Sequence, residues 1–188
     1  MNYYFKIIIS LFLFGCKPIY ISKKDKESYN AINETIYEIT KTKKGVEIYL
    51  FEKPIPINTM LDKNFFTKTY LKEVYGNGGV LGVDSGKISN LIKEIDLNTV
   101  ATEKIDKAQR WDSSQFRFPY RFLKKNIKNS IPKHKQNNLS MPLFVGNNYF
   151  FIYTDYFCGS ECGQGSVVIF KKINGQWEHY ERLPVWIS

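Results

Sequence analysis

The sequence predicts an α+β domain in which N-terminal helices pack on a C-terminal antiparallel β-meander. Two patterns indicate this fold class. Apolar residues between positions 29 and 95 recur at intervals of three and four, as on one face of a helix. From position 142, extended runs alternate with turn residues. A length of 188 residues suits one domain, and a hydrophobic content of 43% excludes a disordered chain.

The first predicted helix is amphipathic and precedes a strand. Its apolar stripe consists of Tyr29, Ile32, Ile36 and Ile39. Ser28 is the predicted N-cap, and Gly45 is the predicted end of the helix. Period-two alternation over residues 46–50 then predicts a half-buried strand, which Pro54 and Pro56 terminate.

Two further helices and a loop complete the N-terminal half. The second helix, over residues 61–75, has an apolar face formed by Leu61, Phe65, Phe66, Leu71 and Val74. The third has one formed by Ile88, Leu91, Ile92 and Ile95. The glycine-rich stretch 76–86 between them is predicted to be a surface loop. A phosphate-binding loop would require glycine where Leu81 stands and Ser or Thr where Ile88 stands.

Four strands are expected near the C-terminus, over residues 142–145, 149–157, 165–172 and 177–187. Asn174-Gly175 between the last two is typical of a type I′ hairpin. Such tight connections predict an antiparallel meander, and we expect the helices to cover one of its faces.

The N-terminus has the features of a targeting signal. Lys6 precedes an apolar run over residues 7–14, which is far too short to cross a bilayer. The run ends in Leu13-Phe14-Gly15-Cys16, which resembles the lipobox of bacterial lipoproteins. That resemblance implies that the Cys16 thiol receives a diacylglycerol and that cleavage makes Cys16 the first residue. An ordinary secretory signal that contains a cysteine is the alternative.

This interpretation divides the chain into a signal peptide (1–15), a polar tether (16–27) and one globular domain (28–188). The protein is then expected in the bacterial cell envelope, held in the membrane by its N-terminal lipid. Lys17, which follows the lipidated position in place of an aspartate, favours the outer over the inner membrane.

A second resemblance covers about the last 50 residues. It lies in a Cys-Gly-x-x-Cys-Gly loop, a Lys-x-x-Gly-x-Trp hairpin and a tryptophan near the last residue. The matching positions are Cys158, Gly159, Cys162, Gly163, Lys172, Gly175, Trp177 and Trp186. This stretch resembles the C-terminal part of small uncharacterised bacterial lipoproteins. The resemblance implies a fold and a location and carries no activity with it.

Cys158 and Cys162 are the two thiols that remain once Cys16 is lipidated, and outside the cytoplasm we expect them to form a disulfide. A redox site, a metal site with His134 and His179, and free thiols are the alternatives. The three-residue gap between the cysteines differs from the two-residue gap of thioredoxin-type oxidoreductases, and the histidines are remote in sequence. We therefore expect no cofactor and no metal.

The excess of positive charge is concentrated in residues 104–135, which hold ten basic and two acidic residues for a net charge of +8. The basic residues are Lys104, Lys107, Arg110, Arg117, Arg121, Lys124, Lys125, Lys128, Lys133 and Lys135. The polyanion-binding candidates among them are Arg117, Arg121, Lys124, Lys125 and Lys128. Aromatic residues alternate through the segment, so a solvated face above buried aromatics is the alternative.

No hydrolase motif is present, since the serine of Gly163-Gln164-Gly165-Ser166 follows the second glycine. The sequence therefore favours a non-catalytic, lipid-anchored binding or interaction module. Its partner would be an anionic lipid headgroup or an acidic glycan, with nucleic acid disfavoured and a protein partner unknown. The alternatives are an envelope enzyme that uses Cys158 and Cys162 for thiol-disulfide chemistry, and a structural domain whose basic face rests on anionic lipid.

Overall fold

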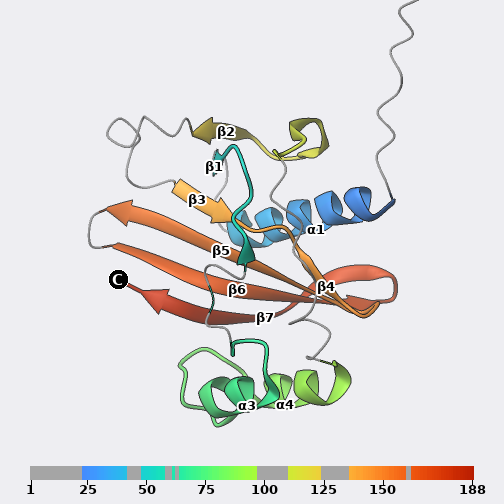
Figure 1. Cartoon of the computed structure of the whole chain (residues 1–188), viewed down its shortest axis with the longest axis vertical. Helices are drawn as coiled ribbons and strands as arrows, with labels where there is room; N and C mark the ends of the chain where they lie inside the picture. The colour runs from blue at the N-terminus through green and yellow to red at the C-terminus, as the bar shows by residue number, and fades with distance from the viewer. Residues whose placement is uncertain are drawn as a thin grey trace, which may run out of the picture.

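The computed structural model describes residues 23–41, 48–57, 61, 64–96, 110–123, 136–159 and 162–188. Within this part of the chain, seven strands form one mixed sheet in the order β2-β1-β3-β5-β6-β7, with β4 also paired to β5 (Figure 1). The helical elements are α1 (Lys23–Thr40), α3 (Lys68–Leu71), η1 (Lys72–Gly76, a π-helix), α4 (Ser85–Glu94) and η2 (Ser113–Gln115, a 3₁₀ turn). The strands are β1 (Ile48–Phe51), β2 (Tyr120–Leu123), β3 (Gln136–Leu139), β4 (Leu143–Val145), β5 (Tyr149–Gly159), β6 (Cys162–Ile173) and β7 (Gln176–Ile187). The predicted α+β class is confirmed.

Strands β4 to β7 form the predicted antiparallel meander. β5 and β6 pair from Tyr149↔Lys171 to Gly159↔Cys162, and β6 pairs with β7 along its length. Asn174 and Gly175 have φ angles of +50° and +82°, as both central positions of a type I′ turn require. This turn matches the twist of the two long strands that it joins.

The other side of the sheet is built differently. β1 pairs in parallel with both β2 and β3, and these three strands have four residues each. β2 is therefore an edge strand, opposite β7. Strand β3 was not expected, because Gln-Asn-Asn-Leu carries no apolar alternation.

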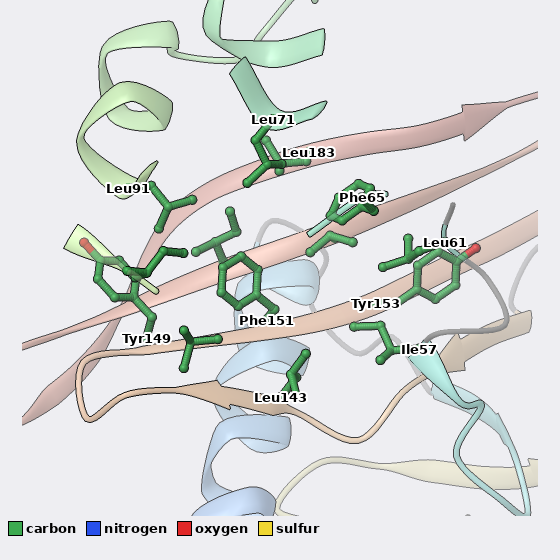
Figure 2. Packing of buried hydrophobic residues seen from close by; sticks show 14 of the residues in the cluster. Ile57, Leu61, Phe65, Leu71, Leu91, Leu143, Tyr149, Phe151, Tyr153 and Leu183 are labelled. Atoms are coloured by element: carbon green, nitrogen blue, oxygen red, sulfur yellow. The ribbon is translucent and has the colours of Figure 1, made fainter. Parts of the chain in front are cut away.

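The helices lie on both faces of the sheet, so the expectation that they cover one face is wrong. On one face, Ile32 and Ile36 of α1 pack with Phe150 and Ile152 of β5. On the other face, α3, η1 and α4 cover the alternate residues of the same strands, and Leu71 and Leu91 lie toward the sheet residues in Figure 2. The physical reason is that β5 and β6 are apolar on both faces, and each face must be shielded from water.

The helix α1 begins at Lys23, within the stretch assigned to the tether. Ser28 therefore lies inside the helix and is buried, so its prediction as the N-cap is wrong. Three residues of the predicted apolar stripe, Tyr29, Ile32 and Ile36, are buried, and the fourth, Ile39, is half-buried. Gly45 lies outside the described residues.

The second predicted helix is shorter than expected. Thr67 caps α3 by accepting a hydrogen bond from the backbone N–H of Tyr70 at 3.2 Å, so the helix begins after Leu61 and Phe65. Both of these residues are nevertheless buried. Asp84 caps α4 in the same way through Lys87 N at 3.1 Å. The loop between these helices is exposed as predicted, and the side chain of Leu81 in this loop is fully exposed (100%).

Candidate functional sites

Residues 110–123 run along the β2 edge of the sheet, and we call this segment the basic rim. Its aromatic side chains pack in a row, with ring centroids of Phe116 and Phe118 4.9 Å apart and those of Tyr120 and Phe122 5.2 Å apart. Phe116, Phe118 and Phe122 contact the core cluster beneath α1. The period-two alternation of the sequence therefore turns the aromatic residues inward.

Three arginines of the basic rim are exposed: Arg110, Arg117 and Arg121. Arg110, whose side chain is 76% exposed, lies 3.8 Å from a Glu52 oxygen. Asp112 is used locally, since its carboxylate accepts hydrogen bonds from the backbone and hydroxyl of Ser114 at 3.2 and 2.7 Å. The rim therefore has three exposed arginines and one acidic residue of its own, Asp112, and Glu52 of the neighbouring segment faces Arg110.

The basic rim is fastened to the middle of α1. The amide of Asn33 donates to Gln115 O at 3.0 Å and accepts from Arg117 N at 2.9 Å. The Tyr29 hydroxyl accepts a hydrogen bond from Asp112 N, and the Arg117 guanidinium donates to the Asn30 side chain. These contacts place the basic rim beside the middle turns of α1, on the α1 face of the sheet.

Trp111 joins the basic rim to the sheet. It is buried, and its indole N–H donates to Phe51 O at 2.9 Å, while its backbone N–H donates to Glu52 O at 3.3 Å. The other polyanion-binding candidates, Lys124, Lys125 and Lys128, lie outside the described residues, as do Cys16 and His134.

The cysteine hairpin lies at the turn between β5 and β6. Gly159 and Cys162 are opposite each other, and the register shifts between Phe157 and Gly159, so Cys158 occupies a β-bulge. Cys162 is exposed, and the side chain of Cys158 is not described. The disulfide between them stays a prediction.

A chain of buried polar groups next to this hairpin was missed by sequence reasoning. The Trp186 indole donates to the Tyr153 hydroxyl at 2.7 Å, and that hydroxyl donates to Asp155 at 3.1 Å. The second oxygen of Asp155 accepts hydrogen bonds from the side chain and backbone of Asn138 at 2.6 and 3.2 Å. The chain thus connects β7, β5 and β3 across the sheet.

Burial determines the protonation behaviour of this chain. Asp155 is 1% exposed, and burial raises the pKa of its carboxyl, although the hydrogen bonds from Asn138 and Tyr153 oppose that shift. Burial likewise raises the pKa of Tyr153. Both groups therefore favour their neutral forms more than they would in water.

Two glycines of β6 make room for Trp186. A Cβ atom at Gly165 would lie 2.1 Å from the Trp186 indole nitrogen and 2.5 Å from the Tyr153 hydroxyl oxygen. At Gly163 the Cβ would lie 3.1 Å from the indole ring. The glycines and the tryptophan noted in the sequence thus form a packing unit that closes the end of the sheet.

The Lys-x-x-Gly-x-Trp motif is also explained by packing. Lys172 and Trp177 are cross-strand partners beside the type I′ turn, and the Lys172 ammonium lies 4.9 Å from the centroid of the Trp177 ring. The same ammonium lies 3.4 Å from Glu27 of α1. This motif therefore joins α1 to the meander.

A second missed cluster joins α4 to the meander. Glu94 accepts hydrogen bonds from Lys171 at 2.7 Å and from the Tyr149 hydroxyl at 2.5 Å. The hydrogen bonds from Lys171 and Tyr149 lower the pKa of Glu94, whereas burial and the bond to Glu94 raise the pKa of Tyr149 to about 12. Glu94 lies at the end of the third predicted helix, and its partners Tyr149 and Lys171 are more than 50 residues away in the sequence.

His179 lies on β7 and packs edge-on against Phe170, with its Nδ1 3.8 Å from a Glu38 oxygen. Burial lowers the pKa of its imidazole. His179 pairs with Phe170, eight residues along β6 from Cys162, which corresponds to about 26 Å. The register therefore keeps this histidine away from the cysteine hairpin.

Within the described ranges, no group of three His, Cys, Asp or Glu side chains is arranged to hold a metal ion. None of the helices in those ranges has the length and apolar character needed to cross a membrane. No family model, no curated protein and no solved structure matches the chain.

Proposed function

We propose that the protein is a lipid-anchored domain of the bacterial cell envelope that acts as a non-catalytic interaction module and binds an anionic partner through the basic rim. The observation that carries this proposal is the exposure of Arg110, Arg117 and Arg121 along one edge of the sheet. Each guanidinium presents several N–H donors in a planar array that suits phosphate and carboxylate oxygens.

The support beneath these arginines favours a binding role. The residues on either side of Arg117, Phe116 and Phe118, stack on each other, and the Arg117 backbone N–H donates a hydrogen bond to the Asn33 side chain. Side chains on a supported segment lose less conformational entropy on binding than side chains on an unsupported one. In the sequence, Lys124 and Lys125 follow Leu123 of β2 directly.

Lipid anchoring is the first part of the proposal, and Cys16 is the residue to change. In cells, Cys16→Ser should move the protein out of the membrane fraction, because the thiol that would carry the lipid is lost. Retention of the variant in the membrane fraction, released only by detergent, would contradict the lipoprotein assignment.

Anion binding is the second part, and a dextran sulfate column tests it on a chain that begins at Lys17. Arg117→Glu/Arg121→Glu should elute at clearly lower salt than wild type, because surface ion pairs weaken as salt screens them. Lys72→Glu/Lys93→Glu is the matched control, since it makes the same change in net charge at exposed positions of η1 and α4. Equal shifts for both variants would show that only net charge matters and would contradict a site on the basic rim.

A further inference from the structure

We infer that the anionic partner of the basic rim is the surface of the bilayer that holds the chain, so that the domain rests on the membrane with its β2 edge. This inference depends on the proposed function and adds the identity of the partner and the orientation of the domain. It follows from the position of the basic rim relative to the anchor and from the distribution of charge over the domain.

The first step is the reach of the tether. Six residues separate Cys16 from Lys23, the first residue of α1, and the seven steps from Cα to Cα span at most about 25 Å. Asn33, which holds the basic rim, lies ten residues into α1, about 15 Å along the helix axis. The tether is therefore long enough for the basic rim to reach the lipid headgroups.

The second step is charge. The basic rim has three basic residues and one acidic residue, whereas residues 64–96 on the opposite face of the sheet have four of each. Strand β7, at the other edge, has two glutamates and one arginine. An anionic surface therefore attracts the β2 edge more than it attracts residues 64–96 or strand β7.

The third step is distance across the sheet. Five strand spacings separate β2 from β7, which corresponds to about 24 Å. Screening limits surface electrostatics to about 8 Å at physiological ionic strength. When β2 lies at the headgroups, charges on β7 contribute little, and α3 and α4 lie on the side away from β2 (Figure 1).

The aromatic residues of the basic rim suit the same partner. Tyr120 is half-buried between Phe118 and Phe122, and tyrosine is favoured at the level of lipid headgroups because it is both apolar and polar.

Vesicle sedimentation tests the inference on the chain that begins at Lys17, which retains every described element. Wild type should bind vesicles of phosphatidylglycerol mixed with phosphatidylcholine, release with salt, and fail to bind vesicles of phosphatidylcholine alone. Arg117→Glu/Arg121→Glu should bind the anionic vesicles at least about 30-fold more weakly, and Lys72→Glu/Lys93→Glu should bind much as wild type does. Circular dichroism of each variant checks that the domain remains folded.

Two outcomes would overturn the inference, and they differ from failure of the proposed function. If both variants lose the same affinity, net charge and not the β2 edge governs vesicle binding. If the rim variant alone loses retention on dextran sulfate but wild type does not bind anionic vesicles, the module binds another polyanion, such as an acidic glycan. In that case the proposed function stands and the bilayer is not its partner.

Discussion

The C-terminal meander and the basic rim belong to one sheet but are built in opposite ways. Strands β5 to β7 have 11 or 12 residues, pair antiparallel, and are buried on both faces along most of β5 and β6. The basic rim ends in a four-residue strand that pairs in parallel, with half-buried aromatic residues and exposed arginines. The contrast indicates that the meander supplies most of the stability, whereas exposed side chains of the rim can be replaced with little loss of stability.

The largest expected effect is on stability, and it is measured by replacing one phenylalanine in the meander and one in the basic rim with alanine. Phe151 is fully buried (0%) and meets Phe66 edge-on at 5.7 Å, so Phe151→Ala should lower the free energy of unfolding by about 4 kcal/mol. Phe118→Ala in the rim should lower it by about 1 kcal/mol, because Phe118 is only half-buried. Urea unfolding of both variants measures the difference, and equal losses would show that the rim is part of the stabilising core.

Adding a methyl group inside the meander should have the next largest effect. Gly165→Ala places a Cβ on the Trp186 indole and the Tyr153 hydroxyl, and should cost about 3 kcal/mol through overpacking and a lost hydrogen bond. Gly79→Ala is the control, because nothing lies within 4 Å of that Cβ and its effect should stay within about 0.5 kcal/mol. A neutral Gly165→Ala would mean that Trp186 does not occupy this position.

The predicted disulfide at the end of the meander has a smaller expected effect. Cys158→Ser should reduce the free energy of unfolding by about 1–3 kcal/mol and leave the fold intact, because the closed loop is short. The mass of the intact protein after alkylation without reductant gives an independent measurement. Addition of alkyl groups to both cysteines would show that the thiols are not paired.

The smallest effect is a change of stability with pH that arises inside the meander. Because burial raises the folded pKa of Asp155 above its unfolded value, its contribution to stability is present below the unfolded pKa and is lost as the pH rises through the folded pKa. Asp155→Asn mimics the neutral carboxyl. Wild type should therefore lose stability relative to Asp155→Asn as the pH increases from acidic to neutral.

Glu94 provides a control of opposite sign for the pH measurement. Hydrogen bonds from Lys171 and Tyr149 lower its folded pKa, so its contribution is present above the unfolded pKa and is lost as the pH falls. Relative to Glu94→Gln, wild type should lose stability on acidification. If the stability of wild type relative to Asp155→Asn and relative to Glu94→Gln changed with pH in the same direction, the assignment of a buried carboxyl to Asp155 and an ion-paired one to Glu94 would be contradicted.

Local features of the fold could be predicted from the sequence, and pairings between distant residues could not. The stripe through Ile32 and Ile36 and the Asn174-Gly175 turn depend on neighbours in the chain, and both are confirmed. The burial of both sheet faces could also have been found, because residues 149–153 form an unbroken apolar run. Strand β3 has no such pattern, and its place is fixed by partners on β1 and β5.

The candidate sites follow the same division. The alternation of aromatic residues in the basic rim was visible in the sequence, but the two hydrogen bonds that the Asn33 side chain makes with Gln115 and Arg117 join positions more than 80 residues apart. The buried chain through Asp155 is assembled from three strands, and its carboxyl has no local signature because Asn138 and Trp186 come from other parts of the chain. Such sites arise from tertiary packing and become visible only in the folded structure.

Amide hydrogen exchange of the protein with and without bound phosphatidylglycerol vesicles tests most directly whether the basic rim, and not the meander, contacts the anionic surface. The account predicts slower exchange on binding in residues 110–123, with exchange in β5 to β7 and in α4 unchanged. Slower exchange in β7 or α4 together with no change in residues 110–123 would contradict it.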